Sequence, residues 1–264
     1  MPMELGLEGK VAIVTGSSDG LGRACAERLS AEGVRVTVCA RREGHLREAA
    51  AAIEHATGHE VLAVPLDVGA PESPERLIGA TVERFGRLDI LVNNAGTSAA
   101  APFEKVSDEL WGEDFDVKLF GAIRCARQAV PHMRRQGGGR IVNILNTGAK
   151  VPRAGTLPTA AARAAGLAVT KAISREYAPE NILVNAVCIG VVRSAQWERL
   201  WQREKPELSE EEFYEWFAGY REVPVGRVAH ASELADLVTF LVSERASYIT
   251  GVAINFDGGS TPIW

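Results

Sequence analysis

Short, uniformly apolar runs rich in β-branched residues recur along the chain, and longer helix-forming segments separate them. Runs that are apolar at every position are typical of strands covered on both faces of a sheet. A helix between two strands returns the chain to the same edge, so the alternation predicts a parallel sheet. We therefore expect a doubly wound α/β fold of about seven strands with helices on both faces. The predicted strands are 11–15, 34–39, 61–66, 90–93, 141–145, 182–187 and 252–256.

The alternation continues over all 264 residues without a repeat or a linker, which predicts one domain, 1–264. Its rhythm is interrupted at about 191–229, a segment that holds seven of the 17 aromatic residues. Two interpretations stand side by side. The segment is a lid over a bulky or planar substrate, or it is a pair of amphipathic helices whose aromatics fill their own core. These aromatics are Trp197, Trp201, Phe213, Tyr214, Trp216, Phe217 and Tyr220.

Charge and cysteine usage limit the partners. The formal net charge of -5 provides no basic field for nucleic acid or an anionic membrane, and no run of about 18 apolar residues occurs. Residues 1–10 carry charge and glycine, which predicts neither a secretory signal nor an anchor. The cysteines form no C-x-x-C pair and the histidines no ligand spacing, so we expect a cytoplasmic protein without a metal. The cysteines are Cys25, Cys39, Cys125 and Cys188.

A glycine-rich turn follows the first predicted strand. Residues 15–22 read TGSSDGLG, and a helical stretch begins at about 23. Glycines let the backbone approach a pyrophosphate closely, and the N–H groups and dipole of a helix start favour its charge. This strand–turn–helix context predicts a Rossmann-like dinucleotide site. The expected cofactor contacts here are Gly16, Ser18, Gly20, Leu21 and Gly22.

The end of the second predicted strand bears on the choice between NAD(H) and NADP(H). NAD is usually held there by a carboxylate on the ribose 2′-hydroxyl, but this chain reads Ala40-Arg41-Arg42. A guanidinium offers a bidentate fork to phosphate oxygens, so we expect NADP(H) to be favoured, with Arg41 on the 2′-phosphate. Against this, the arginines could simply be solvated, and Asp19 in the turn would repel a phosphate.

Three motifs together resemble the short-chain dehydrogenase/reductase (SDR) family over essentially the whole chain: the glycine turn, NNAG at 93–96 and DGG at 257–259. The resemblance implies a homo-oligomer, either homotetramer or homodimer, acting on a small molecule. Ile189 stands where the family usually has a proline. The family pattern also implies further cofactor contacts: Asp67 and Val68 at the adenine, Asn93, Ala95 and Gly96 along the cofactor, and Ile189, Gly190, Val192 and Ser194 at the nicotinamide amide.

SDR chemistry is hydride transfer in which a Tyr moves the proton, a Lys lowers the pKa of that Tyr, a Ser holds the substrate oxygen and an Asn supports a water chain. Alignment with this pattern implies that all four are replaced: Ser by Asn146, Tyr by Thr159, Lys by Arg163 and Asn by Lys118. A positioned acid–base group contributes roughly 10²–10⁴ in rate, and a Thr hydroxyl lacks the pKa of a phenol. Arg163 retains only the hydrogen bond to the nicotinamide ribose.

Three hypotheses follow, and whether the chain is a working enzyme stays open. In the first, it is an NADP(H)-dependent oxidoreductase acting on a carbonyl or alcohol, with Lys118 as a rebuilt proton donor whose pKa is lowered by Arg163 and burial. The opposing interpretation is that Lys118 only pairs with Asp114 on the same helix. In the second, the protein is a regulatory or catalytically dead cofactor-binding pseudoenzyme. In the third, ranked last, Lys118 and Arg163 bind a carboxylate or halide, as in the related halohydrin dehalogenases.

Overall fold

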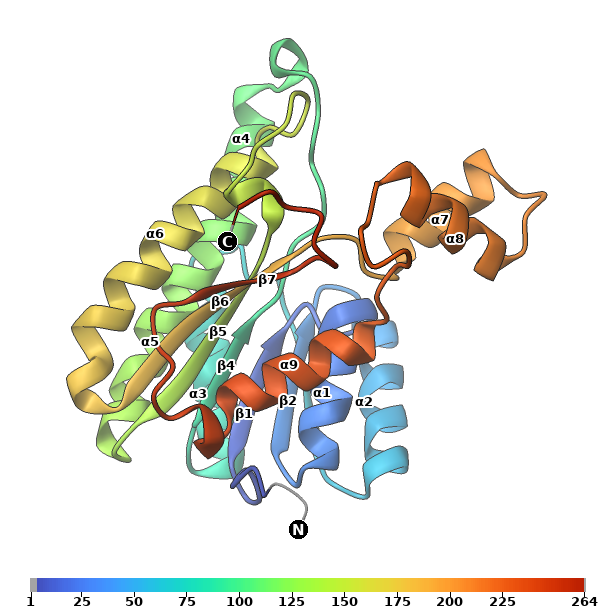
Figure 1. Cartoon of the computed structure of the whole chain (residues 1–264). Coiled ribbons are helices and arrows are strands. Elements are labelled where there is room, and N and C mark those ends of the chain that lie inside the picture. The colour runs from blue at the N-terminus through green and yellow to red at the C-terminus, as the bar shows by residue number, and fades with distance from the viewer. Residues whose placement is uncertain (1–3, 264) are drawn as a thin grey trace.

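The computed structural model describes residues 4–263, and within them it contains a parallel seven-stranded sheet of order β3-β2-β1-β4-β5-β6-β7 (Figure 1). The predicted doubly wound fold is confirmed. The first helix begins at Gly20 and not at about 23 as predicted, because the Asp19 side chain caps the helix there. The strands are β1 (Val11–Thr15), β2 (Arg35–Ala40), β3 (Val61–Pro65), β4 (Ile90–Asn93), β5 (Gly139–Asn146), β6 (Ile182–Ile189) and β7 (Ala253–Phe256).

Helices cover both faces of the sheet, and β1 shows why its sequence is apolar throughout. Ala12 and Val14 pack into a core with α1, α2 and α9, whereas Ile13 packs into a second core with α3 and α5. Successive side chains of a strand point to opposite faces of the sheet, so the side chains on both faces must be apolar. The helices are α1 (Gly20–Ala31), α2 (Glu43–Thr57), α3 (Ser73–Phe85), α4 (Asp108–Phe115), α5 (Gly121–Arg135), α6 (Thr159–Tyr177), α7 (Ala195–Glu204), α8 (Glu210–Tyr220) and α9 (Ala231–Val242).

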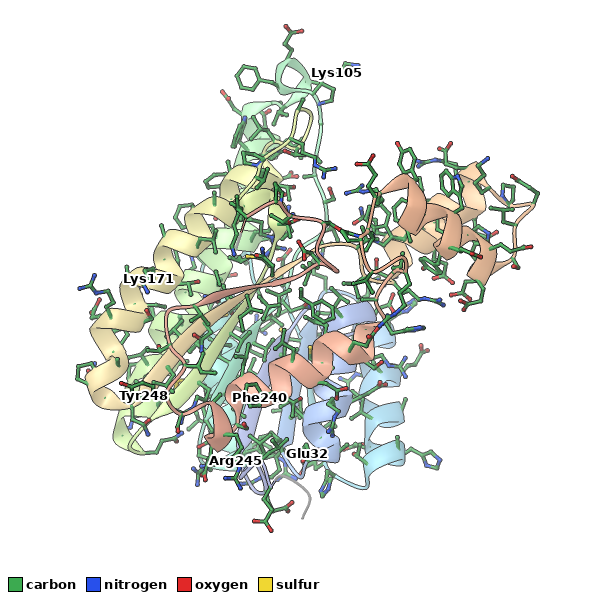
Figure 2. The ribbon with its side chains drawn as sticks, in the orientation of Figure 1. Glu32, Lys105, Lys171, Phe240, Arg245 and Tyr248 are labelled. Atoms are coloured by element: carbon green, nitrogen blue, oxygen red, sulfur yellow. The ribbon has the colours of Figure 1, made fainter. Side chains whose placement is uncertain are left out.

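The segments that follow the strands gather at the carboxyl ends of β1, β4, β5 and β6, where α4, the start of α6 and the α7–α8 pair extend beyond the sheet (Figure 1). The strand order reverses at β1, and ligands of open α/β sheets bind at such a switch point. Tyr248 lies at the other end of the sheet (Figure 2). Tyr177 ends the 19-residue helix that Thr159 begins, so neither tyrosine reaches this edge.

A π-helical turn, η2 (Asp116–Phe120), joins α4 to α5. The Gly121 N–H donates to Asp116 O, five residues back, instead of the four residues of an α-helix. Lys118 lies in this turn and is buried. Turns of this kind occur frequently at functional sites, and no pattern in the sequence predicted this one.

The aromatic segment forms two helices, α7 and α8, with a core of their own. Phe213, Tyr214 and Phe217 are buried there, with Trp197 and Trp201 packed against them. Helical packing therefore accounts for most of these aromatics, although Tyr220 stays exposed. That 1–264 is one domain stays a prediction.

All four cysteines are buried, and burial raises the pKa of Cys25 and of Cys39 to about 12. Thiols of this kind are poor nucleophiles. Among residues 4–263, no group of three or more His, Cys, Asp or Glu side chains is arranged to hold a metal ion. The helices that the structure describes include none long and apolar enough to cross a membrane.

Candidate active site

The glycine turn has the shape that a diphosphate needs. Gly16 and Gly20 have φ values of +65° and +54°, which L side chains rarely adopt. A Cβ on Gly22 would overlap the carbonyl oxygen of Gly16 and lie 2.5 Å from Asn94 Nδ2. A Cβ on Gly20, by contrast, would have no atom within 4 Å. The turn therefore packs tightly against the NNAG segment on one side and is open on the other.

The start of α1 adds hydrogen-bond donors on that open side. Asp19 Oδ1 accepts from Gly20 N at 2.7 Å, and the first amide with a partner four residues back is that of Arg23, which donates to Asp19 O at 3.3 Å. The intervening amides, of Leu21 and Gly22, belong to the first turn, where helices leave N–H groups free for anions. These residues fit the diphosphate of a dinucleotide.

The NNAG motif ties the end of β4 to the glycine turn. Thr15 Oγ1 accepts from Asn94 N and Ala95 N at 2.9 and 3.0 Å, and Asn94 Nδ2 donates to Thr15 O and Gly16 O. Asn93 is buried, and its amide donates to Asn143 Oδ1 at 2.9 Å. The side chain of Asn93 therefore links β4 to β5 through a hydrogen bond. The sequence analysis did not predict the structural role of Asn94. The position of Asn94 between two predicted contacts, Asn93 and Ala95, could have indicated it.

Arg41 and Asp67 lie together at the ends of β2 and β3. The Arg41 side chain is 71% exposed, and its Nη1 is 3.9 Å from Asp67 Oδ2. Asp67 Oδ1 accepts from Gly69 N at 2.9 Å, and Val68 is buried beside it. An exposed pair at this distance holds the guanidinium weakly, so Arg41 is free to turn toward a phosphate.

A buried polar cluster joins η2 to the start of α6. Lys118 forms an ion pair with Asp114, and its Nζ donates to Thr159 Oγ1 at 3.1 Å. Ala99 N also donates to Thr159 Oγ1, at 3.1 Å. Asp114, Lys118 and Thr159 are each at most 6% exposed. The pairing of Lys118 with Asp114 that the spacing suggested is therefore present, together with a contact to Thr159.

Because the Thr159 oxygen accepts two hydrogen bonds, its own O–H proton remains to be donated. A group next to Thr159 can thus receive a proton from a hydroxyl that is itself hydrogen-bonded to an ammonium. This arrangement can act as a general acid, or in reverse as a base.

Arg163 lies beside Lys118. A Cβ on Gly96 would be 2.9 Å from Arg163 Nη2 and 3.0 Å from Lys118 Cγ, so only glycine allows both side chains to pass there. Arg163 Nη1 donates to Ile144 O at 2.8 Å, and burial lowers the pKa of Arg163 to about 10. The guanidinium therefore stays charged at neutral pH and cannot serve as a proton relay.

Burial, and to a smaller extent Arg163, lowers the pKa of Lys118 to about 7. The carboxylate of Asp114, in contact with the ammonium, acts in the opposite direction because an opposite charge favours the charged form. The Asp114 carboxylate therefore raises the Lys118 pKa relative to the value that burial and Arg163 set.

Lys118 also borders two pockets. Arg163 and Asn143 line one of them, and Thr15 and Ala95 of the glycine-turn region line the other. Three buried polar atoms around this site have no partner in the described chain: Asp114 Oδ2, Asn146 Oδ1 and Arg163 Nε. Each of these atoms has hydrogen-bonding capacity left for a ligand.

The segment after β6 begins at Gly190, next to the DGG motif. Gly190 N donates to Phe256 O at 2.9 Å, and a Cβ on Gly190 would be 2.6 Å from Asp257 Cβ. The DGG motif thus packs against Gly190. Val192 is buried, and Ser194 is the N-cap residue of α7 without a side-chain capping hydrogen bond, while Ile189 pairs in register with Asn146. The cofactor roles of these residues and of Ser18 stay predictions.

Comparison with known proteins assigns the family. Residues 16–261 match the family model described as enoyl-(acyl carrier protein) reductase. The chain is 36% identical over 261 residues to a Streptomyces coelicolor protein named "Putative ketoacyl reductase", covering 96% of this chain and 97% of the relative.

Two solved structures of similar proteins agree over nearly the whole chain. One is L-sorbose reductase of Gluconobacter frateurii in complex with NADPH and L-sorbose, with a TM-score of 0.93, 33% identity and coverage of 99% and 100%. The other is an NADPH-bound short chain oxidoreductase of Pseudomonas aeruginosa, described as containing an atypical catalytic center, with a TM-score of 0.92, 31% identity and coverage of 98% and 99%. The chain therefore belongs to the short-chain dehydrogenase/reductase family of oxidoreductases.

Proposed function

We propose that this protein is an NADP(H)-dependent oxidoreductase that interconverts a carbonyl and an alcohol, with Lys118 supplying the proton through Thr159. The observation that carries the proposal is the buried contact of 3.1 Å between Lys118 Nζ and Thr159 Oγ1. All four positions of the usual Asn-Ser-Tyr-Lys set are then replaced, by Lys118, Asn146, Thr159 and Arg163, and the chemistry is rebuilt on them.

The cofactor would supply the hydride. The open side of the glycine turn and the first amides of α1 suit its diphosphate, and Arg41 suits the 2′-phosphate that distinguishes NADP from NAD. Ala95 and Gly96 run between this turn and the Lys118 cluster. Arg163 would donate to the nicotinamide ribose, as the family pattern implies.

The proton path is short. The Thr159 O–H donates to the substrate oxygen as that oxygen gains charge, and Lys118 Nζ returns a proton to Thr159 Oγ1. A free Thr hydroxyl is too weak an acid for this step, but one that receives a proton as it gives one need not become an alkoxide. Asn146 Oδ1, buried and unpaired, is available to accept a hydrogen bond from the alcohol.

The alternative is a cofactor-binding protein without turnover, and the buried Lys118–Asp114 ion pair favours it, because a paired lysine can be purely structural. Both functions predict NADPH binding. The discriminating experiment measures NADPH affinity by cofactor fluorescence and then NADPH oxidation with L-sorbose and with a panel of ketones and 3-oxoacyl thioesters. Turnover that requires Lys118 supports the oxidoreductase. Tight binding without any turnover supports the alternative.

Cofactor preference provides a second test. Arg41→Gln should weaken NADPH binding about tenfold or more and leave NADH binding unchanged, since a hydrogen bond to a charged group contributes about 1.5–3 kcal/mol. The matched control is Arg47→Gln, an exposed arginine on α2 paired with Glu43. Equal effects of Arg41→Gln on the two cofactors would contradict the assignment to the 2′-phosphate.

The pH profile tests the proton donor. Lys118 must be protonated to act in reduction, so kcat should be constant at low pH and fall as the pH rises through a Lys118 pKa of about 7. The oxidation rate should rise over the same range. Asp114→Asn removes the carboxylate that favours the ammonium, so the falling limb should move to lower pH. A limb that stays in place in this variant would separate Lys118 from the titration.

We also propose a cytoplasmic homotetramer or homodimer that acts on a small molecule. The four buried, unpaired thiols support a reducing compartment, and the family resemblance supports the assembly. Light scattering on the purified full-length chain measures the oligomeric state directly.

A further inference from the structure

A short segment after β3, residues 67–70, packs against the π-helical turn η2. A Cβ on Gly69 would be 3.0 Å from Val117 Cγ2, in the middle of the turn. A Cβ on Gly121, the residue that follows the turn, would be 2.9 Å from the carbonyl oxygen of Val68. Two glycines, one in each segment, therefore allow the two backbones to approach closely.

Arg124 of α5 joins the same two segments through hydrogen bonds. Its Nη1 donates to Gly69 O at 2.9 Å, and its Nη2 donates to Asp116 Oδ1 at 3.1 Å. Its side chain is 22% exposed, and its Cζ lies 5.3 Å from the centroid of the Phe120 ring. Asp116 and Phe120 are the first and last residues of η2. One rigid, forked guanidinium thus contacts both ends of the turn and the segment after β3.

The turn that Arg124 holds also carries the candidate acid. Lys118 lies at its centre, and Nζ of this residue donates to Thr159 Oγ1 at 3.1 Å. Val68 and Lys118 line one pocket together with Thr15 of the glycine-turn region. The segment after β3 and the Lys118 side chain therefore border a common cavity.

π-helical turns are rare, so the backbone alone does not favour this shape and the contacts around the turn must fix it. We propose that Arg124 is a positioning residue that locks the π turn onto the 67–70 segment. Binding of the adenosine half of NADP(H) at that segment then also fixes Lys118 against Thr159. The catalytic use of Lys118 and the adenine at 67–70 rest on the proposed function, but the locking of the turn by Arg124 does not.

The first experiment measures the coupling without turnover. Hydrogen–deuterium exchange of the amides of 116–121 is followed in the full chain by mass spectrometry. The probe is adenosine 2′,5′-bisphosphate at saturation, which carries the adenosine half of NADP and no nicotinamide. Without the probe, Arg124→Met should speed this exchange about tenfold or more, the loss expected for one hydrogen bond to a charged group. The probe should slow the exchange in the wild type and leave it nearly unchanged in Arg124→Met.

The matched control is Arg127→Met, which removes the same charge from an exposed residue of α5 and should leave the exchange at the wild-type rates. Arg124→Lys keeps the charge without the fork and should fall between the wild type and Arg124→Met. Asp116→Asn, a milder change at a carboxylate that is 49% exposed, repeats the test if Arg124→Met does not fold.

Two results would overturn the proposal. One is exchange in 116–121 that neither Arg124→Met nor Asp116→Asn speeds. The other is a ligand effect that does not depend on Arg124, or exchange that neither the bisphosphate nor NADPH slows in the wild type.

A second experiment separates this inference from the proposed function. Steady-state rates are normalised to the number of sites that bind NADPH, so that loss of folded protein does not count. Arg124→Met should then lower kcat about tenfold or more and leave KM for the carbonyl substrate unchanged, because a small misplacement of a catalytic group can cost about 10²-fold in rate. Arg124→Lys should recover part of the loss. If no carbonyl is reduced, the oxidoreductase proposal fails, while the exchange rates still decide whether Arg124 locks the turn.

Discussion

Lys118→Met is expected to lower kcat for carbonyl reduction by about 10²–10⁴ while NADPH affinity changes less than about threefold. In the described part of the chain, the Lys118 side chain donates to Asp114 and Thr159 and forms no hydrogen bond with the glycine turn or Arg41, so the loss should fall on the chemical step. Single-turnover and steady-state NADPH oxidation measure the first effect, and cofactor fluorescence measures the second.

The same substitution leaves the Asp114 carboxylate buried without its partner. Breaking a buried pair in this way destabilises a protein by about 3–5 kcal/mol, so Lys118→Met alone could lose activity by unfolding. The double variant Lys118→Met, Asp114→Leu removes both charges and should recover most of the stability in urea unfolding. Its activity should stay at the level of the single variant. Recovery of activity along with stability would show that Lys118 is only a structural residue.

Gly22→Ala is the second large effect. The added Cβ would overlap the Gly16 carbonyl oxygen, which is backbone and cannot move without opening the glycine turn. Overpacking of this kind typically lowers the free energy of unfolding by about 1–3 kcal/mol. Because the displaced turn also holds the diphosphate in the proposed function, NADPH affinity should fall about tenfold or more. Thermal unfolding and cofactor titration measure the two effects.

Gly79 provides the control for that variant. It lies within α3, has no atom within 4 Å of a Cβ and lacks a positive φ. Gly79→Ala should therefore leave cofactor binding unchanged and stabilise the fold by up to about 1 kcal/mol. If Gly22→Ala behaved like Gly79→Ala, the close approach at the turn would have no part in binding.

The fold could be predicted from the sequence because each strand is covered on both faces, as Ala12, Ile13 and Val14 illustrate. Such apolar runs indicate a parallel sheet when helices alternate with them. The second strand was predicted one residue early at each end, and the last strand was predicted to start one residue early. The fifth strand starts two residues earlier and the sixth ends two residues later than predicted, since hydrophobicity does not mark the residue at which pairing stops. The aromatic core of α7 and α8 needed the structure, because amphipathic helices and lids share the same composition.

The sequence predicted which residues belong to the candidate site better than it predicted how they contact one another. The spacing of Asp114 and Lys118 predicted their pairing, because residues four apart lie on one face of a helix. The contact between Lys118 and Thr159 joins residues far apart in the chain, and no periodicity encodes it.

The π-helical turn at Asp116–Phe120 offers this site a particular route of evolutionary change. It accommodates one residue more than an α-helix of the same span, so deletion of a single codon would restore a continuous α-helix. The helices on either side would keep their orientation, because a π-helical turn takes up the extra residue locally. The side chain that faces Thr159 would then depend on which residue of 116–120 is lost, while the seven strands kept their registers. The polar partner of Thr159 can therefore be exchanged by deleting one residue, a route that point substitutions in the core do not offer.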